Sequence, residues 1–299
     1  MHNMMKRNDV KERQNEAFSI DMLSAQRHYY SMAKCVVYAT AFFCVIVVAV
    51  LSILNRAYSN EILRNAVLAY SIIAFLLNTI LTNERNKLQT LAAQIQHLFD
   101  IRLFELKWDT ALCGVEPRVE YVERGKQEKR NKLDDWYKDV PEDLPLDAVT
   151  LVCLRMNVAY DQNMKRKFNM FIYCVFLIVI IAILASNFQR TLWEMTLFTL
   201  VPMLPVVKFF YDVKGRIESD KERLIRLDVR IDTLMKNAIR NGIIERNELQ
   251  IISNLIYEHR RTSPLVPDWL YYLLRVREET TADYSAKHYY HELRNVYGG

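Results

Sequence analysis

The sequence predicts an all-α membrane protein with four transmembrane helices in two hairpins and a mainly helical cytoplasmic module that holds at most one or two short strands. Three stretches of the 299-residue chain carry no charged residue, namely Val36–Asn55, Asn65–Asn83 and Phe168–Gln189. Charge-free apolar runs of this length are typical of helices that cross a bilayer. The charged residues, 25% of the chain, are therefore concentrated between these runs.

The first two runs predict the first hairpin. The run that begins at Cys35 lies too far from the N-terminus, and is too long, for the apolar part of a cleaved signal peptide, so we expect a retained span. The second run, near Ala66–Thr82, is about long enough to cross a hydrocarbon core of roughly 30 Å. Its polar residues Asn78 and Thr79 are expected to face protein rather than lipid.

The fourth span, Leu192–Tyr211, has the weakest signal, because Glu194 and Lys208 bracket a short charge-free core that contains Pro202 and Pro205. We include it because the two termini would otherwise lie on opposite faces of the membrane. Each proline removes a backbone hydrogen-bond donor and weakens the helix. We therefore predict that the pair forms a hinge for gating; the alternative is a static kink that only shapes packing.

Basic residues predict the orientation. The connections 55–65 and 186–191 hold only three of the 40 Lys and Arg, which leaves 37 on the other side. Cytoplasmic segments of membrane proteins carry the excess of Lys and Arg. We therefore place both termini and both long segments in the cytoplasm.

This topology divides the chain into five segments. They are a cytoplasmic N-terminal helix (1–33), a first transmembrane hairpin (34–83), a cytoplasmic sensor segment (84–167), a second transmembrane hairpin (168–212) and a cytoplasmic helical C-terminal segment (213–299). Within the sensor segment, weak alternation predicts one short strand at Ile101–Trp108, the charged stretch Val115–Lys132 predicts a loop, and Pro145 is expected to open a helix.

An amphipathic helix follows each hairpin and is expected to continue its second span. Apolar residues repeat at helical spacing on one face of each, at Leu88, Leu91, Ile95 and Leu98 and at Ile217, Leu224, Leu227, Ile231 and Leu234. These stripes pack either inside one subunit or between subunits.

The chain carries no pattern typical of an enzyme. Six glycines form no phosphate-binding or dinucleotide-binding loop, and the five cysteines show no paired spacing. Only His288 and His291 have helix-face spacing, with no further ligand cluster to complete a metal site. We expect no catalytic residue, no metal and no bound cofactor.

The stretch from Tyr257 to Tyr272 brings guanidinium and aromatic groups together. Guanidiniums bind phosphates bidentately and aromatic faces stack on bases. The candidate ligand-binding residues are Arg260, Arg261, Asp268, Trp269, Tyr271 and Arg275. The alternative is a corner between two helices, in which Trp269 fills the core and Asp268 caps the next helix or pairs with an arginine.

Two further groups could contact a ligand. Asp135 and Trp136 belong to an acidic and aromatic cluster that could bind an adenine edge, although capping or packing also explains it. The basic triplet Lys165–Lys167 could hold an anionic lipid or a phosphate, although its place before a span also explains it.

Several short motifs, in this order around four spans, resemble the SMODS-associated four-transmembrane effector family of bacterial CBASS antiviral defence. They are Arg13–Asn15, Ala25–Arg27 with Tyr30, Ile95–Asp100, Leu133–Tyr137, Leu144–Leu146, Arg155–Asn157 with Tyr160 and Asp161, and Arg260–Pro264 with Asp268, Trp269 and Tyr271. The resemblance covers most of the chain. It assigns no ligand residues, so the positions named above, with Arg155, remain candidates.

The resemblance implies a non-enzymatic effector in the bacterial inner membrane. A partner nucleotidyltransferase would make a cyclic di- or trinucleotide, the activating ligand; the cytoplasmic module would bind it, and the protein, as a homo-oligomer in the lipid bilayer, would permeabilise the membrane. No DNA or RNA partner is expected. The alternative is a constitutive ion channel or membrane scaffold without a nucleotide ligand.

Overall fold

The computed structural model describes residues 8–58, 60–127, 133–185 and 191–297, and this part of the chain forms helices and no strand, which confirms the all-α fold class. The helices that build the two hairpins and their extensions are α2 (Ala17–Ala41), η1 (Phe42–Ile46), α3 (Val47–Tyr58), α4 (Glu61–Phe104), α7 (Leu146–Ala185), α8 (Leu192–Met195), η2 (Thr196–Leu200) and α9 (Val201–Asn241). The others are α1 (Val10–Gln14), α5 (Thr110–Cys113), α6 (Val119–Gly125), α10 (Arg246–Thr262) and α11 (Asp268–Tyr297).

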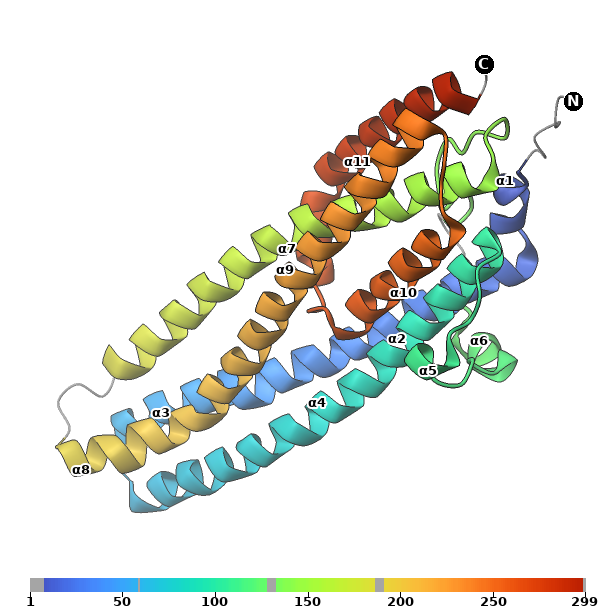
Figure 1. The fold of residues 1–299 in the computed structure, drawn as a ribbon. Helices are drawn as coiled ribbons and strands as arrows, with labels where there is room; N and C mark the ends of the chain where they lie inside the picture. Colours follow the sequence, from blue (N-terminus) through green and yellow to red (C-terminus); the bar gives the residue numbers. More distant parts are fainter. Residues whose placement is uncertain (1–7, 59, 128–132, 186–190, 298–299) are drawn as a thin grey trace, which may run out of the picture.

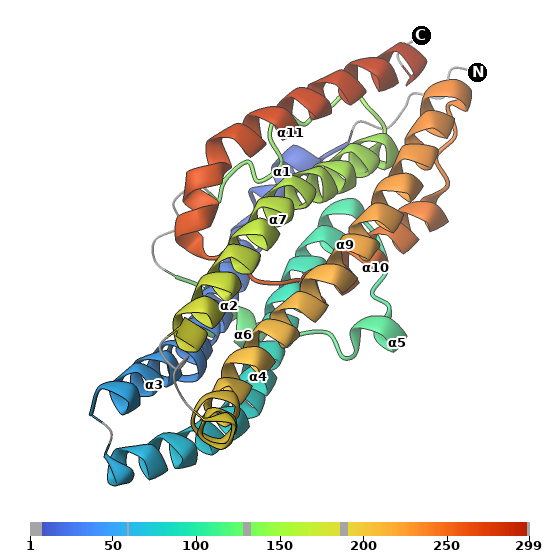
Figure 2. The same cartoon turned by 90° about the vertical axis from the view of Figure 1, so that its left-hand side faces the viewer.

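The helices run along the length of an elongated molecule (Figure 1). One end holds α3, the start of α4, the end of α7 and α8, whereas α1 and the end of α11 lie at the opposite end. A view from another side shows α11 running along α7, away from α5 (Figure 2). Both hairpins therefore turn at the same end of the molecule, opposite the end that holds the first and last helices.

The end with the two hairpin turns exposes an apolar surface. Two helices, Ala17–Asn55 and Glu61–Phe104, are long and apolar enough to cross a membrane, and Lys167–Ala182 is a shorter apolar helix. Large apolar side chains point outward from these helices, among them Phe42, Ile46, Ile53, Ile72, Ile73, Leu76, Leu177, Ile178 and Ile181. An outward band of this kind is what contact with lipid requires.

The four predicted spans pack around a separate apolar interior, which we call the span bundle. Its buried residues are Cys44, Val45, Val48, Ala74, Met203, Val206 and Phe210, with Val175, Phe176 and Val179 of α7 packed against them. The Cys44 thiol donates a hydrogen bond to the Ala74 carbonyl over 3.3 Å. All four spans thus contribute to one interior, as expected for two hairpins packed together.

Spans one and four each contain a π-helical turn, η1 and η2. In these turns Val47 N–H donates to the Phe42 carbonyl and Val201 N–H to the Thr196 carbonyl. The η2 turn ends at Leu200, two residues before Pro202; both Pro202 and Pro205 are buried, and the helix continues through them. The hinge proposed for these prolines stays a prediction, and the wider turn is one place where a helix accommodates the missing donors.

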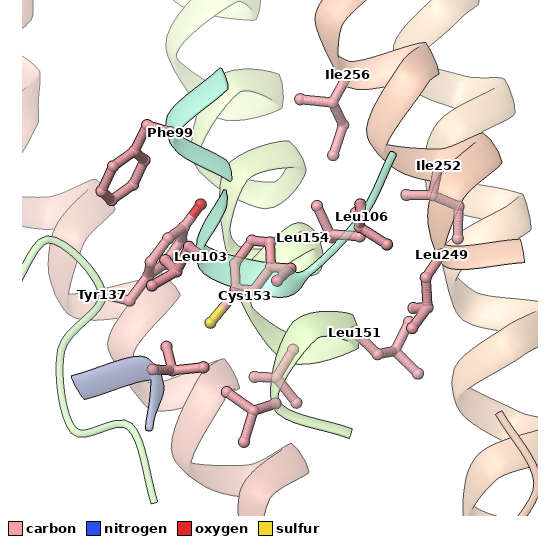
Figure 3. Packing of buried hydrophobic residues seen from close by; sticks show 14 of the residues in the cluster. Phe99, Leu103, Leu106, Tyr137, Leu151, Cys153, Leu154, Leu249, Ile252 and Ile256 are labelled. Carbon is pink, nitrogen blue, oxygen red and sulfur yellow. The ribbon is translucent and has the colours of Figure 1, made fainter. Parts of the chain in front are cut away.

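The half of the molecule outside the spans, which the sequence predicts to be cytoplasmic, has its own core, in which the stripes after the two hairpins meet. Ile95 and Leu98 of α4 and Leu224, Leu227, Ile231 and Leu234 of α9 are buried in the same cluster. Figure 3 shows Leu249, Ile252 and Ile256 of α10 facing Leu106, Leu151 and Leu154. The stripes therefore pack within one subunit in this structure.

Two expectations for the sensor segment are wrong. Ile101–Phe104 continues α4 rather than forming a strand, and the helix ends at Glu105, whose φ of 54° is left-handed. Part of Val115–Lys132 is also helical, as α6. A Cβ at Gly125, the last residue of α6, would lie 2.7 Å from Tyr29 Cε2 and 3.1 Å from Ala25 Cα, so glycine permits α6 to approach α2 closely.

The helix boundaries have local causes. The Asn60 side chain accepts a hydrogen bond from Ile62 N–H over 2.8 Å and caps α4, and α7 begins directly after Pro145, as predicted. The helix α9 ends at Gly242, with φ 65°. These signals set the lengths of the two helices that continue from the spans.

The shared end of the two hairpins generates a topology prediction. Reporter fusions after residues 60 and 188 should be active as periplasmic reporters, whereas fusions after 125 and 299 should be active as cytoplasmic reporters, because the basic residues favour the cytoplasm. Alkaline phosphatase and green fluorescent protein fusions measure the two locations. A C-terminal fusion that is active outside would contradict the four-span topology.

Candidate ligand site

A buried ion pair joins α10 to α4. Arg260, 8% exposed, donates to Asp100 Oδ2 over 2.5 Å. The Tyr137 hydroxyl donates to the other carboxylate oxygen of Asp100 over 2.9 Å and accepts from Asn157 Nδ2 over 2.9 Å. Since each buried polar group has a partner, the network locks α4, α7 and α10 together.

The N-terminal residues brace the same network. Gln14 exchanges two hydrogen bonds with the backbone of Tyr137, over 2.9 and 3.2 Å. Asn15 exchanges two more with Asp135, whose φ of 49° is left-handed. Asp135 thus lies in a turn, and Trp136 packs partly buried against the large core outside the spans. These contacts agree with the packing alternative, and ligand binding by either residue stays a prediction.

Arg260 keeps its positive charge and Tyr137 keeps its proton in this network. Burial alone would lower the pKa of Arg260, but the adjacent Asp100 carboxylate outweighs it and the pKa is raised. Burial, with the charge of Asp100, raises the pKa of Tyr137 well above its ordinary value. The arginine therefore stays cationic and the phenol stays protonated at neutral pH, which keeps the hydrogen bonds in their observed directions.

One turn from Asp100, His97 is fully buried between two aromatic rings. Its ring centre lies 5.1 Å from that of Tyr257 and 5.6 Å from that of Trp108, and neither ring nitrogen has a hydrogen-bond partner in the part of the chain that the structure describes. Burial, with the positive charge of Arg260, lowers the pKa of His97 to about 3. His97 is therefore neutral in the folded protein.

A second charged cluster joins α7, α9 and α10. Lys165 Nζ lies 3.1 Å from Asp220 Oδ2 and 2.7 Å from His259 Nε2. His259 Nδ1 lies 2.9 Å from the other carboxylate oxygen, Asp220 Oδ1. An ammonium only donates, so Nε2 accepts and the proton sits on Nδ1. The first residue of the basic triplet thus has a structural partner inside the protein.

The last turn of α10 is held from the membrane side. Gln89 Nε2 donates to the carbonyls of Arg260 and Ser263 over 2.9 and 2.7 Å. Arg216 donates to the Thr262 carbonyl over 3.4 Å, and Arg223 donates to the Thr262 hydroxyl. Side chains of α4 and α9 therefore satisfy carbonyls that a helix leaves unpaired at its C-terminus.

Two arginines at this junction have no carboxylate partner. Arg85 of α4 is 9% exposed, donates to Asn86 Oδ1 over 3.1 Å and leaves its buried Nε unpartnered; Arg216 of α9 donates to the same Asn86 oxygen. Within the described residues, no carboxylate lies within ion-pair distance of either guanidinium. The charge of Asp212 acts on the pKa of both arginines, but Asp212 is itself paired with Lys208.

The electrostatics of this pair favour an anion. Burial first, and then the charge of Arg216, lower the pKa of Arg85 to about 9; burial likewise lowers the pKa of Arg216. Arg85 is buried and Arg216 is half-buried. Two such guanidiniums without a carboxylate partner are stabilised by an anion between them, and a phosphate suits their fork geometry. Arg85 and Arg216 are therefore the candidate phosphate site.

The predicted candidates after α10 occupy different environments. Arg261 is 35% exposed and pairs with Glu258 over 2.8 Å. Asp268 pairs with Lys34 over 2.5 Å, a lysine rather than the expected arginine. Trp269 is 54% exposed and meets Phe171 edge-on at 5.2 Å, so it does not fill the core. The side chains of Tyr271 and Arg275 lie outside the described residues.

Arg155 lies apart from these residues. It pairs with Asp232 of α9, and its guanidinium lies 4.5 Å from the centre of the Tyr289 ring of α11. The backbone at the end of α10 thus lies beside the phosphate site, where Gln89 and Arg216 bind its carbonyls. The guanidinium of Arg260 is held at Asp100 and that of Arg261 at Glu258, and Arg155 and Asp135 lie at other junctions. Sequence reasoning missed Arg85 and Arg216, since a basic residue beside a span already has an explanation in topology.

Comparison with known proteins gives a consistent result over the whole chain. Residues 8–289 match the family model of the SMODS-associating 4TM effector domain. A protein of Bacillus cereus (strain VD146), named as a probable CBASS effector molecule, is 22% identical over 296 residues, which cover 90% of this chain and 94% of the relative. No solved structure matches the chain.

The buried ion pair generates a stability prediction. Asp100→Asn leaves Arg260 buried without its counter-charge and should cost about 3–5 kcal/mol of unfolding free energy. Glu258→Gln, which breaks the more exposed pair with Arg261, should cost less than about 1 kcal/mol. Denaturant unfolding of the purified proteins measures both; equal losses would contradict the structural role of the Asp100 pair.

The buried histidine generates a pH prediction. Because the pKa of His97 falls from 6.5 to about 3 on folding, only the unfolded chain binds this proton between these pH values. Stability should therefore fall as the pH is lowered through that window, by up to about 1.4 kcal/mol per pH unit from this residue. His97→Phe should remove this part of the slope in melting curves; an unchanged slope would refute it.

Proposed function

Because this chain belongs to the SMODS-associating 4TM effector family, we propose that it is a membrane effector of antiviral defence that binds a cyclic oligonucleotide in its cytoplasmic module and then permeabilises the bacterial inner membrane. The name of the Bacillus cereus relative, a probable CBASS effector molecule, supports the role. The ligand would be a cyclic di- or trinucleotide made by a partner nucleotidyltransferase. No catalytic step by this chain is needed.

The observation that carries this proposal is the pair Arg85 and Arg216. A cyclic oligonucleotide presents phosphodiesters, each with one negative charge, and each guanidinium can donate two parallel hydrogen bonds to such a group. The unpartnered Nε of Arg85 adds a donor in a buried setting, where charge-assisted hydrogen bonds are stronger than in water. A ligand phosphate would thus complete a site that has excess positive charge.

A ligand bound between Arg85 and Arg216 would act directly on the spans. Arg85 lies in α4, which begins at the hairpin turn and includes span two; Arg216 lies in α9, which includes the inner part of span four. A phosphate between them changes how these two helices attract or repel each other at the membrane surface. Binding shifts the protein toward an open state only if that state holds the phosphate more tightly.

The sequence-derived candidates have supporting roles in this proposal. Arg260, held by Asp100, positions the end of α10 against Gln89. Arg261 follows it and is partly exposed, so it is available for a second phosphate or a base. The exposed apolar surface of the spans leaves room for contact with lipid and with further copies of the chain. We therefore keep a homo-oligomer as part of the proposal.

Binding measurements on charge variants test the proposal. Calorimetry with a panel of cyclic di- and trinucleotides should find a ligand whose affinity falls by roughly 10- to 150-fold in Arg85→Gln and in Arg216→Gln, because each variant loses a charge-assisted contact worth about 1.5–3 kcal/mol. Arg216→Lys should recover only part, since an ammonium keeps the charge but lacks the fork.

Arg226→Gln is the matched control, because Arg226 lies on the same helix but is 67% exposed and pairs with Glu222. It should bind the ligand as the unaltered protein does. If no cyclic nucleotide binds, the protein is better explained as a constitutive channel or scaffold. Undiminished affinity in both Gln variants would exclude Arg85 and Arg216 from the ligand site.

A further inference from the structure

Four polar side chains are buried inside the span bundle with an atom that has no partner among the described residues. They are Ser52 and Asn55 of α3, Asn78 of α4 and Thr199 of η2, exposed by 1%, 3%, 1% and 0%. The unpartnered atoms are Ser52 Oγ, Asn55 Nδ2, Asn78 Nδ2 and Thr199 Oγ1. Unpaired polar groups are costly in a membrane interior, and where they persist they mark paths for water or ions.

The polar side chains near the hairpin turns form an outer layer. Cys44 and Ala74 lie at one level, joined by their 3.3 Å hydrogen bond. Ser52 follows Cys44 by eight residues, or about 12 Å along the helix toward the hairpin turn. Thr199 precedes Val206 by seven residues, which places it about 10 Å toward the same end.

A second polar layer lies on the cytoplasmic side. Asn78 follows Ala74 by four residues, or about 6 Å toward the cytoplasm, and Thr40 precedes Cys44 by the same number on the neighbouring helix. Thr40 is 5% exposed and donates to the Val36 carbonyl over 2.8 Å. The span bundle thus has polar side chains toward both of its ends.

Between the layers the interior is apolar and closed. Cys44, Val48, Ala74, Met203 and Val206 are between 0% and 7% exposed and belong to one packed cluster. Narrow apolar layers between wet regions stop ions because water does not enter them. The arrangement of polar, apolar and polar layers is therefore that of a closed ion path with one barrier.

We propose that the interior of the span bundle is the route by which small ions cross the membrane, and that the apolar layer around Ala74 and Val206 is its gate. The inference rests on the proposed permeabilising function and names its route. Asn78 lies seven residues, or about 10 Å, from Arg85 along α4. Arg85 and Ala74 share α4, and Arg216 and Val206 share α9, so a phosphate bound by the two arginines acts on the two helices that contribute to the gate.

Two neighbouring valines of span four provide a matched test. Val206 is fully buried in the gate, whereas Val207 is 43% exposed on the outside of the bundle. Val206→Ser introduces a hydroxyl into the gate, and a barrier lower by about 1.4 kcal/mol passes ions tenfold faster. We expect potassium and chloride efflux from reconstituted vesicles to rise at least about tenfold in Val206→Ser without any nucleotide, and to stay unchanged in Val207→Ser.

The native Cys44 provides a second readout that does not depend on flux. In a variant whose other four cysteines are replaced by alanine, Cys44 is the only thiol and lies in the gate. A charged, water-soluble thiol reagent should modify Cys44 when Val206→Ser is also present and should leave it unmodified with Val207→Ser. Ala74→Ser should act as Val206→Ser does, which covers the case in which one variant fails to fold.

The outcomes separate this inference from the proposed function. Equal efflux in Val206→Ser and Val207→Ser, or release of the larger dye carboxyfluorescein together with the ions, would overturn the route. A third outcome is that vesicles with folded Val206→Ser or Ala74→Ser protein release no ions without nucleotide, whereas vesicles with the unaltered protein release ions when a cyclic nucleotide is added. That outcome would contradict the proposed route but not the proposed function. Leakage through the altered gate in a protein that binds no cyclic nucleotide would overturn the nucleotide proposal alone.

Discussion

The bilayer allows no unpaired backbone groups in contact with lipid, and this requirement shapes the whole molecule. Each span must be an unbroken helix, and α4 and α9 do not stop where their apolar spans end but run on as single helices. The larger core outside the spans is built on these two helices, and α10 is held between them by Gln89 and Arg216. Any force on that core is therefore applied to helices that also form the spans.

Much of the fold was predictable, because the membrane imposes its pattern independently of tertiary contacts. The charge-free runs identified three of the four spans, the requirement that both termini lie on one face supplied the fourth, and the stripes at helical spacing identified the helices that follow. The strand expected at Ile101–Trp108 failed because Ile101, Leu103 and Phe104 are all buried in the last turn of a helix that is surrounded by protein. Alternation over a few residues does not distinguish a strand from a helix that is buried on most sides.

The candidate site was less accessible to sequence reasoning, since the role of an arginine depends on partners far away in the chain. Arg260 meets Asp100 across 160 residues, and this partner makes it a structural residue of the junction. Arg85 and Arg216 lie beside spans, where the topology rule already explains a positive charge. Arg85 is buried and Arg216 is half-buried, and neither has a carboxylate at ion-pair distance among the described residues. This combination exists only in the folded chain.

Each of the two π-helical turns affects the direction in which the side chains of the helix after it point. A π turn is equivalent to one extra residue in an α-helix, and each residue rotates the helix by about 100°. Val206 and Arg216 both follow η2 in α9, so the extra residue contributes to the direction in which each side chain points. An insertion or deletion of one residue inside span four would rotate the rest of α9 by about 100° about its own axis, so the length of the span and the direction of Arg216 change together.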